Sequence, residues 1–353
     1  MTFVPRRHGR RRKGRFAYAR TRALGEDQLY AALDLGTNNC RLLVARPADE
    51  AFEVVDSFSR IVRLGQGLQA SGRLSEEAVD RTITALRICA SKMRRRGVTR
   101  LRSVATEACR LAANCEDFVA RVRDETGVRL EIIEAVEEAR LAALGCAPLL
   151  RRSMRRALVF DIGGGSTEVM WLSVPRVGPP EVIDSVSVPW GVVRMAEVYG
   201  GYEITPETYA GMIDEVTVHL EPFEARNRIA REVAERQVQM LGTSGTVTTL
   251  CGIHLALPRY QRSIVDGQQL SFEQVSTVSE RLREMDYLAR AAHPCVGRER
   301  ADLVVAGCAI LAAICAMWPV GSLRVADRGV REGILFTLMA ADGLVVCGGR
   351  SAE

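Results

Sequence analysis

The chain has 353 residues, of which 47% are apolar, 26% charged and 5% aromatic. This length suggests two domains, each large enough to bury a core. Residues 1–25 contain eight Arg and one Lys but no acid, so they carry +9 and leave −4 of the chain's net +5 for the rest. A generally basic nucleic-acid-binding body is therefore excluded, whereas residues 1–27 are expected to form a disordered basic arm.

The cysteines and the apolar runs indicate a cytoplasmic protein. The ten cysteines are scattered without a Cys-x-x-Cys pair, and no His stands near enough in sequence to complete a zinc site. Such free thiols are typical of a reducing compartment. The uncharged run 303–318 would form a helix of about 24 Å, short of the roughly 20 residues that a membrane span needs. We expect a buried helix there and no membrane span.

The first half of the chain, residues 28–153, predicts an α/β domain that opens with three strands. The expected strands are 30–36, 40–45, one within 52–68, 101–106 and 129–133. Ser75 is expected to cap a helix that starts with two acids and ends with three Arg before Gly97, as the helix dipole and C-cap geometry favour. Further helices are expected at 107–126 and 136–146.

The opening pattern recurs 127 residues later, in ALVFDIGGGSTEVMWL, so that Asp161 matches Asp34 and Gly163 matches Gly36. This internal repeat predicts a second domain of the same type over residues 154–329. Its expected elements are a helix starting at Thr205-Pro206-Glu207, a strand, turn and helix start in 238–250, a helix with a Ser271–Gln274 capping box, and a strand at 322–327. A final helix at about 330–341 is expected to pack back on the first domain, before a tail at 342–353.

Each repeat places an Asp at the end of a buried strand, directly before a turn of small residues. Backbone N–H groups in such turns can converge on phosphate oxygens, and the Asp adds a hard oxygen ligand for Mg²⁺. A third loop, residues 242–246, stands between a strand and a helix, where the free N–H groups of the helix start attract anions. Taken in isolation, this loop would be interpreted as a helix N-cap formed by Ser or Thr. One such turn would be an ordinary hairpin, but two in register with a third loop favour phosphate binding. A weaker turn of this kind lies at 326–329.

The sequence resembles the exopolyphosphatase/guanosine pentaphosphatase family, within the superfamily of acetate and sugar kinases, heat-shock chaperone ATPases and actin. The resemblance spans about residues 30–341. It rests on DLGTNNCRLLVA (34–45), RLGQGL (63–68), ATEACRLAAN (105–114), EEARL (137–141), DIGGGSTE (161–168), LGTSGTV (241–247) and DRGVREG (327–333). It implies two ribonuclease-H-like domains facing across a cleft, in the short form that lacks the further helical domain of long members.

The resemblance also implies roles for matching residues. Glu138 falls where the family keeps its catalytic base, although a Glu there would also complement the helix dipole. Arg110 matches the phosphate-binding arginine. Asp161 and Glu168 match the acids that hold Mg²⁺ or Mn²⁺ and position the water. The phosphate-binding loops correspond to Asp34, Gly36, Thr37, Asn38, Gly163, Gly164, Gly165, Ser166, Thr167, Gly242, Thr243, Ser244 and Gly245.

Two positions depart from the family pattern. Asn39 stands where members usually have Ser, which is expected to alter one phosphate contact. Ala135-Val136 stands where they tend to have Gly or Asn, which is expected to stiffen the segment before the paired acids. Neither change removes the implied base or the implied metal ligands.

The implied function is a phosphohydrolase of acid anhydrides. It would release terminal orthophosphate from inorganic polyphosphate or convert pppGpp to ppGpp, a reaction of the stringent response, by attack of a water activated by Glu138. The alternatives are an ATP-dependent kinase or ATPase of the same superfamily, and a non-catalytic polyphosphate or alarmone sensor. The resemblance implies a homodimer. The basic arm is either a solvated tail or a contact for RNA or another polyanion.

Overall fold

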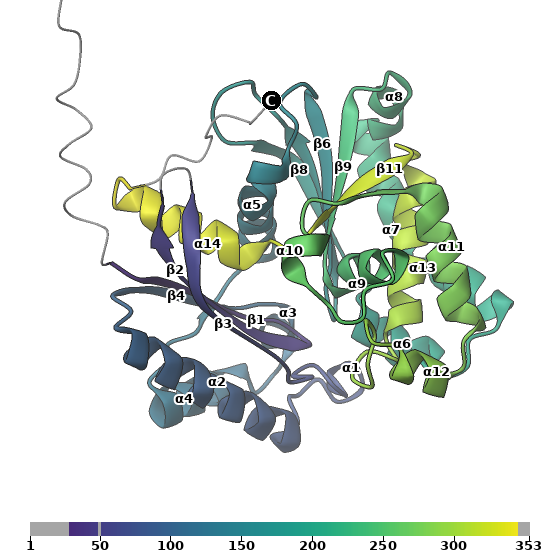
Figure 1. Ribbon diagram of the computed structural model, residues 1–353. Coiled ribbons are helices and arrows are strands. Elements are labelled where there is room, and N and C mark those ends of the chain that lie inside the picture. The colour runs from purple at the N-terminus through teal and green to yellow at the C-terminus, as the bar shows by residue number, and fades with distance from the viewer. Residues whose placement is uncertain (1–27, 49–50, 345–353) are drawn as a thin grey trace, which may run out of the picture.

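Each half of the chain folds around one mixed β-sheet (Figure 1). The computed structural model describes residues 28–48 and 51–344. The expected basic arm and the last nine residues of the expected tail lie outside the described residues. Two α/β domains result, as the sequence predicted, and the fold is that of paired ribonuclease-H-like domains.

The first sheet has the strand order β3-β2-β1-β4-β5. β1, β2 and β3 are antiparallel neighbours, whereas β4 and β5 run parallel to β1. The strands are β1 (Tyr30–Leu35), β2 (Asn39–Pro47), β3 (Phe52–Ile61), β4 (Arg100–Ala105) and β5 (Glu131–Ile132). The associated helices are α1 (Leu68–Ser71), α2 (Glu76–Arg96), α3 (Glu107–Leu111), α4 (Cys115–Thr126) and α5 (Ala135–Cys146), with a 3₁₀ turn η1 (Ala147–Leu149) after α5.

The second sheet has the strand order β10-β11-β9-β6-β7-β8. β6, β7 and β8 are antiparallel, and β9 and β11 run parallel to β6. The strands are β6 (Arg156–Ile162), β7 (Thr167–Ser173), β8 (Glu181–Val188), β9 (Val238–Thr243), β10 (Gln269–Ser271) and β11 (Ser322–Ala326). The helices are α6 (Val192–Tyr199), α7 (Pro206–Asn227), α8 (Ile229–Ala234), α9 (Gly245–His254), α10 (Arg262–Val265), α11 (Phe272–Glu284), α12 (Tyr287–Ala292), α13 (Val304–Met317) and α14 (Val330–Ala341).

The expected internal repeat is confirmed in atomic detail. β1 and β2 of the first sheet correspond to β6 and β7 of the second, and the same hydrogen bond closes both turns. The Gly36 N–H donates to the Asn39 carbonyl at 2.9 Å, and the Gly163 N–H donates to the Ser166 carbonyl at 2.9 Å. Asn39 therefore occupies in the first turn the position that Ser166 occupies in the second.

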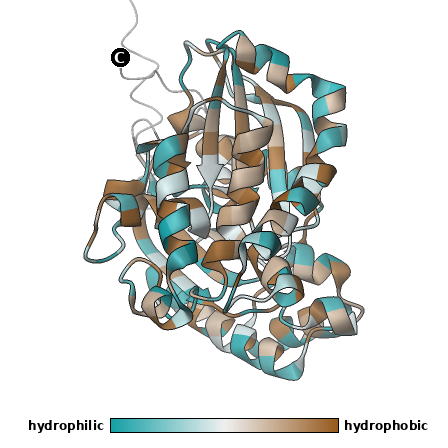
Figure 2. Ribbon diagram, turned by 90° about the vertical axis from the view of Figure 1, so that its right-hand side faces the viewer, coloured by the Kyte–Doolittle hydropathy of each residue, from teal (hydrophilic) through white to brown (hydrophobic). Residues whose placement is uncertain are grey.

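Several predicted helix ends are also confirmed. The side chain of Ser75 accepts the Ala78 N–H, α2 ends at Gly97 in the left-handed region, and Ser271 forms the expected capping box. The surface helices mix hydrophilic and hydrophobic residues along their length (Figure 2), as amphipathic helices do. α13 is an exception because ten of its residues are buried, and no helix in the described part of the chain is long and apolar enough to cross a membrane.

The helix expected over residues 107–126 is in fact two. α3 stops because Ala112 turns to an extended conformation, and the Asn114 side chain binds the backbone of Leu74 through both of its polar atoms, at 2.9 and 3.0 Å. The strand expected at 129–133 is reduced to two residues. Beyond it, the Ile133 carbonyl accepts a hydrogen bond from the Arg110 side chain instead of extending the sheet.

α5 and α14 lie between the two sheets and share one hydrophobic core with both of them (Figure 1). The two helices cross in direct contact: a Cβ on Gly145 would stand 2.0 Å from the Gly329 carbonyl oxygen, so only glycine fits there. α14 also packs on β1, and just beyond it Asp342 accepts hydrogen bonds from Tyr30 at 2.8 Å and from Arg100 at 2.6 Å. The last helix of the described residues therefore completes the first domain.

Candidate active site

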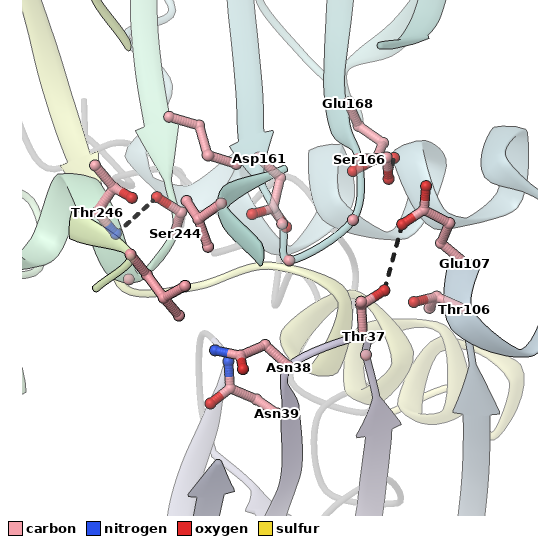
Figure 3. Close-up of a pocket in the computed structure, with 18 of the residues that line it drawn as sticks. Thr37, Asn38, Asn39, Thr106, Glu107, Asp161, Ser166, Glu168, Ser244 and Thr246 are labelled. Carbon is pink, nitrogen blue, oxygen red and sulfur yellow. Dashed lines mark hydrogen bonds between the residues drawn. The ribbon is translucent and has the colours of Figure 1, made fainter. Parts of the chain in front are cut away.

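Two turns that each begin with a glycine, one from each domain, face each other across a cleft (Figure 3). Thr37 and Asn38 follow β1, and the Gly163–Ser166 turn follows β6. The turns are in contact, because a Cβ on Gly164 would lie 3.1 Å from atoms of both Thr37 and Asn38. The pocket between them has a volume of about 110 Å³.

The turn of the second domain is fixed by the start of α6. The Val192 N–H donates to the Gly163 carbonyl at 3.0 Å, and the Val193 N–H donates to the Gly164 carbonyl at 2.7 Å. Because the C=O and the following N–H of a trans peptide point in opposite directions, the N–H groups of Gly164 and Gly165 point away from α6. Both glycines line the pocket. The turn is thus held as a set of backbone donors, which suits phosphate oxygens.

The third loop supplies the start of α9 to the same pocket. Ser244 caps this helix by accepting the N–H groups of Thr246 at 3.1 Å and Val247 at 3.3 Å. Its backbone has a φ of 147°, which a residue with a side chain rarely adopts. Ser244, Gly245 and Thr246 line the pocket, so the positive end of the helix dipole faces it.

Five carboxyl groups line the pocket: Asp34, Glu107, Glu138, Asp161 and Glu168. Burial raises the pKa of Asp161 to about 7, and repulsion by Glu168 acts in the same direction. The same two causes raise the pKa of Glu107 to about 7. Burial is also the main reason why the pKa values of Asp34, Glu138 and Glu168 lie above their usual range. The pocket therefore favours a ligand that adds positive charge to these acids.

Glu138, in the first turn of α5, is held by Arg110 of α3. Arg110 donates through one nitrogen to a Glu138 oxygen at 2.9 Å and to the Ile133 carbonyl at 2.7 Å. Both side chains are largely buried, with 15% and 14% exposed. Arg110 does not itself line the pocket, whereas Glu138 does. The guanidinium therefore fixes the carboxylate from behind and opposes the rise of its pKa.

Glu168 is oriented in a similar way by two hydroxyl groups. Ser166 donates to one of its oxygens at 2.5 Å and Ser187 donates to the same oxygen at 3.0 Å. Its cross-strand partner is Asp161 on β6. At the equivalent place of the first repeat, the partner of Asp34 is Arg41. The position opposite the Asp of each repeat thus holds a carboxylate, Glu168, in the second domain and a guanidinium, Arg41, in the first.

A second pocket, of about 240 Å³, continues from the first and shares Asp34, Arg41, Asp161 and Arg300 with it. Five arginines line it: Arg41, Arg262, Arg300, Arg328 and Arg331. Arg262 pairs with the buried Glu332 at 2.6 Å, and Arg328 pairs with Asp266 at 2.8 Å. Within the described residues the other three arginines form no ion pair, so this pocket suits a polyanion.

Most residues that the sequence singled out meet in the first pocket, where the structure places Asp34, Gly36, Thr37, Asn38, Glu138, Asp161, Gly163, Gly164, Gly165, Ser166, Glu168, Ser244 and Gly245. Four others do not line it. Arg110 stands behind Glu138, Thr167 donates to the Trp190 carbonyl, Gly242 packs on Phe160, and Thr243 lines the second pocket.

Sequence reasoning missed Glu107, Arg41 and Arg300, which also line the pocket. Glu107 and Arg41 stand inside segments that the resemblance already used, but no spacing rule separated them from their neighbours. Glu107 accepts a hydrogen bond from Thr37 at 3.3 Å and lies against Gly165 of the other domain. Arg300 precedes α13 and stands in a short run of charged residues, 298–302, which gave no signal of a role in the site.

The pocket fits a divalent cation that is bound together with a phosphate ligand. Within residues 28–48 and 51–344, no three His, Cys, Asp or Glu side chains form a ready-made metal site. Mg²⁺, however, is usually held by one or two carboxylates, several waters and substrate phosphates. Asp161 and Glu168 offer such oxygens, and the buried Asn38 Oδ1 in the same pocket has no hydrogen-bond partner among the residues that the structure describes.

The fold and the site define a two-domain ribonuclease-H-like protein that gathers phosphate-binding turns and buried carboxyl groups in one cleft. The sequence profile of the Ppx/GppA phosphatase family matches residues 43–341, and the chain belongs to this family. It is accordingly a phosphohydrolase of the exopolyphosphatase type, as the resemblance implied.

Individual relatives agree with this assignment. The chain is 31% identical to exopolyphosphatase 2 of Mycobacterium tuberculosis over 322 residues, which cover 87% of this chain and 98% of the relative. It is 27% identical to the Aquifex aeolicus member of the Ppx/GppA family, whose crystal structure matches with a TM-score of 0.72 over 89% of this chain and 98% of that one. An exopolyphosphatase from Cytophaga hutchinsonii shares the fold, with a TM-score of 0.80 at 22% identity over 91% of this chain and 100% of that one.

Proposed function

We propose that the chain removes terminal orthophosphate from inorganic polyphosphate, with pppGpp as a second candidate substrate, by direct attack of water. The observation that carries this proposal is the position of Glu138. Its carboxylate lines the same pocket as both glycine turns and is oriented by Arg110. A fixed carboxylate beside a phosphate-binding pocket is the arrangement that a general base for a hydrolytic water requires.

In this mechanism the backbone N–H groups of the Gly163–Ser166 turn and the start of α9 hold the terminal phosphoryl group. Glu138 orients a water and accepts its proton as the oxygen attacks phosphorus in line with the departing chain. The raised pKa of Glu138 makes it a stronger base than an ordinary carboxylate once it is ionised. The fixed turns limit the motion of the reacting groups, which lowers the entropic cost of the reaction.

Asp161 and Glu168 are the side chains that would hold Mg²⁺ or Mn²⁺ with the substrate. When bound, the cation would offset negative charge on the phosphoryl oxygens. It would also relieve the repulsion among the buried carboxyl groups. Activity is therefore expected to require a divalent cation and to be lost in excess chelator.

The remainder of the phosphate chain would extend into the arginine-lined second pocket. Arg41 and Arg300 line both pockets and Arg331 lines the second, and none of the three forms an ion pair within the described residues. Guanidinium groups bind phosphate oxygens in pairs of hydrogen bonds. This pocket is the feature that favours a long polyphosphate over a single terminal phosphate group.

The test is phosphate release by the purified chain from long polyphosphate, tripolyphosphate and pppGpp in parallel, with ATP plus candidate acceptors to detect a kinase. Glu138→Gln should lower turnover by about 10²–10⁴, the usual contribution of a general base, with substrate binding retained. The matched control is Glu137→Gln, because Glu137 pairs with Arg102 and Arg140 and does not line the pocket. Wild-type turnover by Glu138→Gln would remove Glu138 from the role of base.

A further inference from the structure

The loop between β3 and α1 belongs to the first domain but binds the second. Its residue Arg63 donates to both carboxylate oxygens of Asp302, at 3.0 and 3.1 Å, and to the Glu299 carbonyl at 3.0 Å. A few residues further on, the Gly67 N–H donates to a carboxylate oxygen of Glu197 in α6 at 2.9 Å. These hydrogen bonds join the two domains at a place distinct from the shared core around α5 and α14.

The backbone of the same loop holds the phosphate-binding turn of the first domain. The N–H groups of Val62 and Arg63 both donate to the Asn38 carbonyl, at 2.8 and 3.0 Å, and the Gly65 N–H donates to the Thr37 carbonyl at 2.9 Å. Thr37 and Asn38 line the first pocket. The position of this turn is therefore tied to the loop that carries Arg63.

The Arg63 guanidinium binds the second domain on both sides of Arg300. Its partners Glu299 and Asp302 stand directly before Arg300 and two residues after it, in the loop between α12 and α13. Arg300 lines both pockets and forms no ion pair within the described residues. Arg63 thus connects the phosphate-binding turn of the first domain to the loop that presents a free guanidinium from the second.

The backbone of Arg63 is strained. Its φ is 48°, in the left-handed region that residues with a side chain seldom adopt. Residues in such conformations persist where surrounding contacts fix them, and they cluster at functional sites. Arg81 of α2 supplies part of the fixing, because it donates to the Val62 carbonyl at 3.1 Å and to the Gln66 side chain at 3.1 Å. The loop is therefore held in the form that directs Arg63 to the other domain.

The pair of Arg63 and Asp302 also differs from an ordinary surface ion pair. The two side chains are 30% and 16% exposed, and the guanidinium binds the carboxylate through two nitrogens. Two-point geometry with low exposure distinguishes ion pairs that hold a structure from the many that contribute nothing. The ion pair of Arg46 and Glu53, inside the first domain, is more exposed, at 49% and 58%.

We propose that Arg63 is a positioning residue that fixes Arg300 opposite the phosphate-binding turn of the first domain, so that both contact one polyphosphate chain. The identity of this ligand rests on the proposed function. Arg63 itself lines neither pocket, so it acts through Arg300 and the turn. A displacement of about 1 Å in a reacting array can lower a rate about 10²-fold, so the loss of Arg63 should lower turnover as well as binding.

The experiment measures phosphate release from long polyphosphate, with kcat and KM separated. Arg63→Ala should lower kcat/KM by about 10- to 100-fold, and Asp302→Asn should cause a smaller loss, because the bond to the Glu299 carbonyl stays. Arg63→Lys keeps the charge but not the planar fork and should also lose less. In an Arg300→Ala background, Arg63→Ala should add less than about threefold, because two residues that act as a unit are not additive.

The matched control is Arg46→Ala, which breaks the more exposed ion pair with Glu53 and should leave kcat/KM unchanged. An unchanged kcat/KM in folded Arg63→Ala would overturn the proposal. A full loss on top of Arg300→Ala would overturn it too, because a merely structural role of Arg63 gives additive effects. Should Arg63→Ala not fold, Asp302→Asn and its combination with Arg300→Ala decide in the same way.

Amide hydrogen exchange gives a readout that does not depend on activity. In the ligand-free full-length chain, Arg63→Ala should speed exchange in residues 297–303, whereas Arg46→Ala should not. A wild-type chain that releases no phosphate from any of the substrates would refute the proposed function. The positioning role would then still be decided by exchange, and unchanged exchange in residues 297–303 would overturn it.

Discussion

Replacing Arg110 by Ala tests whether this residue acts through Glu138 or binds phosphate directly. The structure places its guanidinium behind Glu138, 2.9 Å from the carboxylate and outside the pocket lining. At an effective dielectric constant of about 20, opposite charges about 4 Å apart attract by about 4 kcal/mol. Loss of this attraction corresponds to a roughly 10³-fold change in the proton affinity of Glu138.

Arg110→Ala should therefore raise the pKa of Glu138 further and reduce the fraction of the proposed base that is ionised at a given pH. Turnover at pH 7 is expected to fall by up to about 10³-fold and to recover as the pH is raised, because the base ionises there. Arg110→Lys, which keeps the positive charge, should show a smaller loss. The assay is phosphate release as a function of pH, with kcat and KM separated.

Two further measurements distinguish these two roles of Arg110. In a Glu138→Gln background, Arg110→Ala should add little, because two residues that act as a unit are not additive. A raised KM with an unchanged pH profile would refute this interpretation. It would instead support the phosphate-binding role that the family resemblance implies for Arg110.

Three other perturbations follow from the packing and the charges. Gly145→Ala should destabilise the protein by about 1–3 kcal/mol or more in urea unfolding, because its Cβ would stand 2.0 Å from the Gly329 carbonyl oxygen. Gly211→Ala is its control within α7, where the new Cβ would stand 3.8 Å from the Tyr199 ring, and it should be neutral or stabilising by up to about 1 kcal/mol. Asp161 and Glu107 both have pKa values of about 7 in the folded chain, so the folded chain binds more protons at these residues than the unfolded chain does. The free energy of unfolding without ligand should therefore fall as the pH rises from about 4 to above 7. A rise of the free energy of unfolding over that range would contradict the burial of these acids. Asp161→Asn should remove the contribution of Asp161 to this pH dependence, while that of Glu107 stays, and should also remove the response to Mg²⁺ with polyphosphate. Both effects are measured by thermal unfolding.

The sequence predicted those parts of the fold that are encoded by local pattern. The repeat of an Asp and a glycine turn between two strands indicated both sheets, and Ser75 and Ser271 marked helix starts through their own side chains. The break between α3 and α4 was missed because its cause is tertiary: Asn114 binds Leu74, forty residues away. A five-residue helix also lacks the length over which apolar periodicity becomes visible.

In the site, too, the residues in local motifs could be predicted, whereas those placed by tertiary packing could not. Glu138 and Asp161 were identified because each belongs to a contiguous segment that resembles the family. Arg300 was missed because it enters the cleft from a loop before α13, and only the packing of distant segments brings it beside Arg41. The placement of Arg110 behind Glu138 depends on the angle between α3 and α5, which no residue spacing specifies.

The return of α14 to the first domain has a consequence for folding during synthesis. β1, β2 and α5 are complete by Cys146, but the helix that covers them begins only at Val330. At about 5–20 residues per second, the roughly 180 residues in between take about 10–40 s to make. Throughout that interval the first sheet lacks part of its core. The domain that is first in the sequence can therefore reach its native state only when nearly the whole chain has been made.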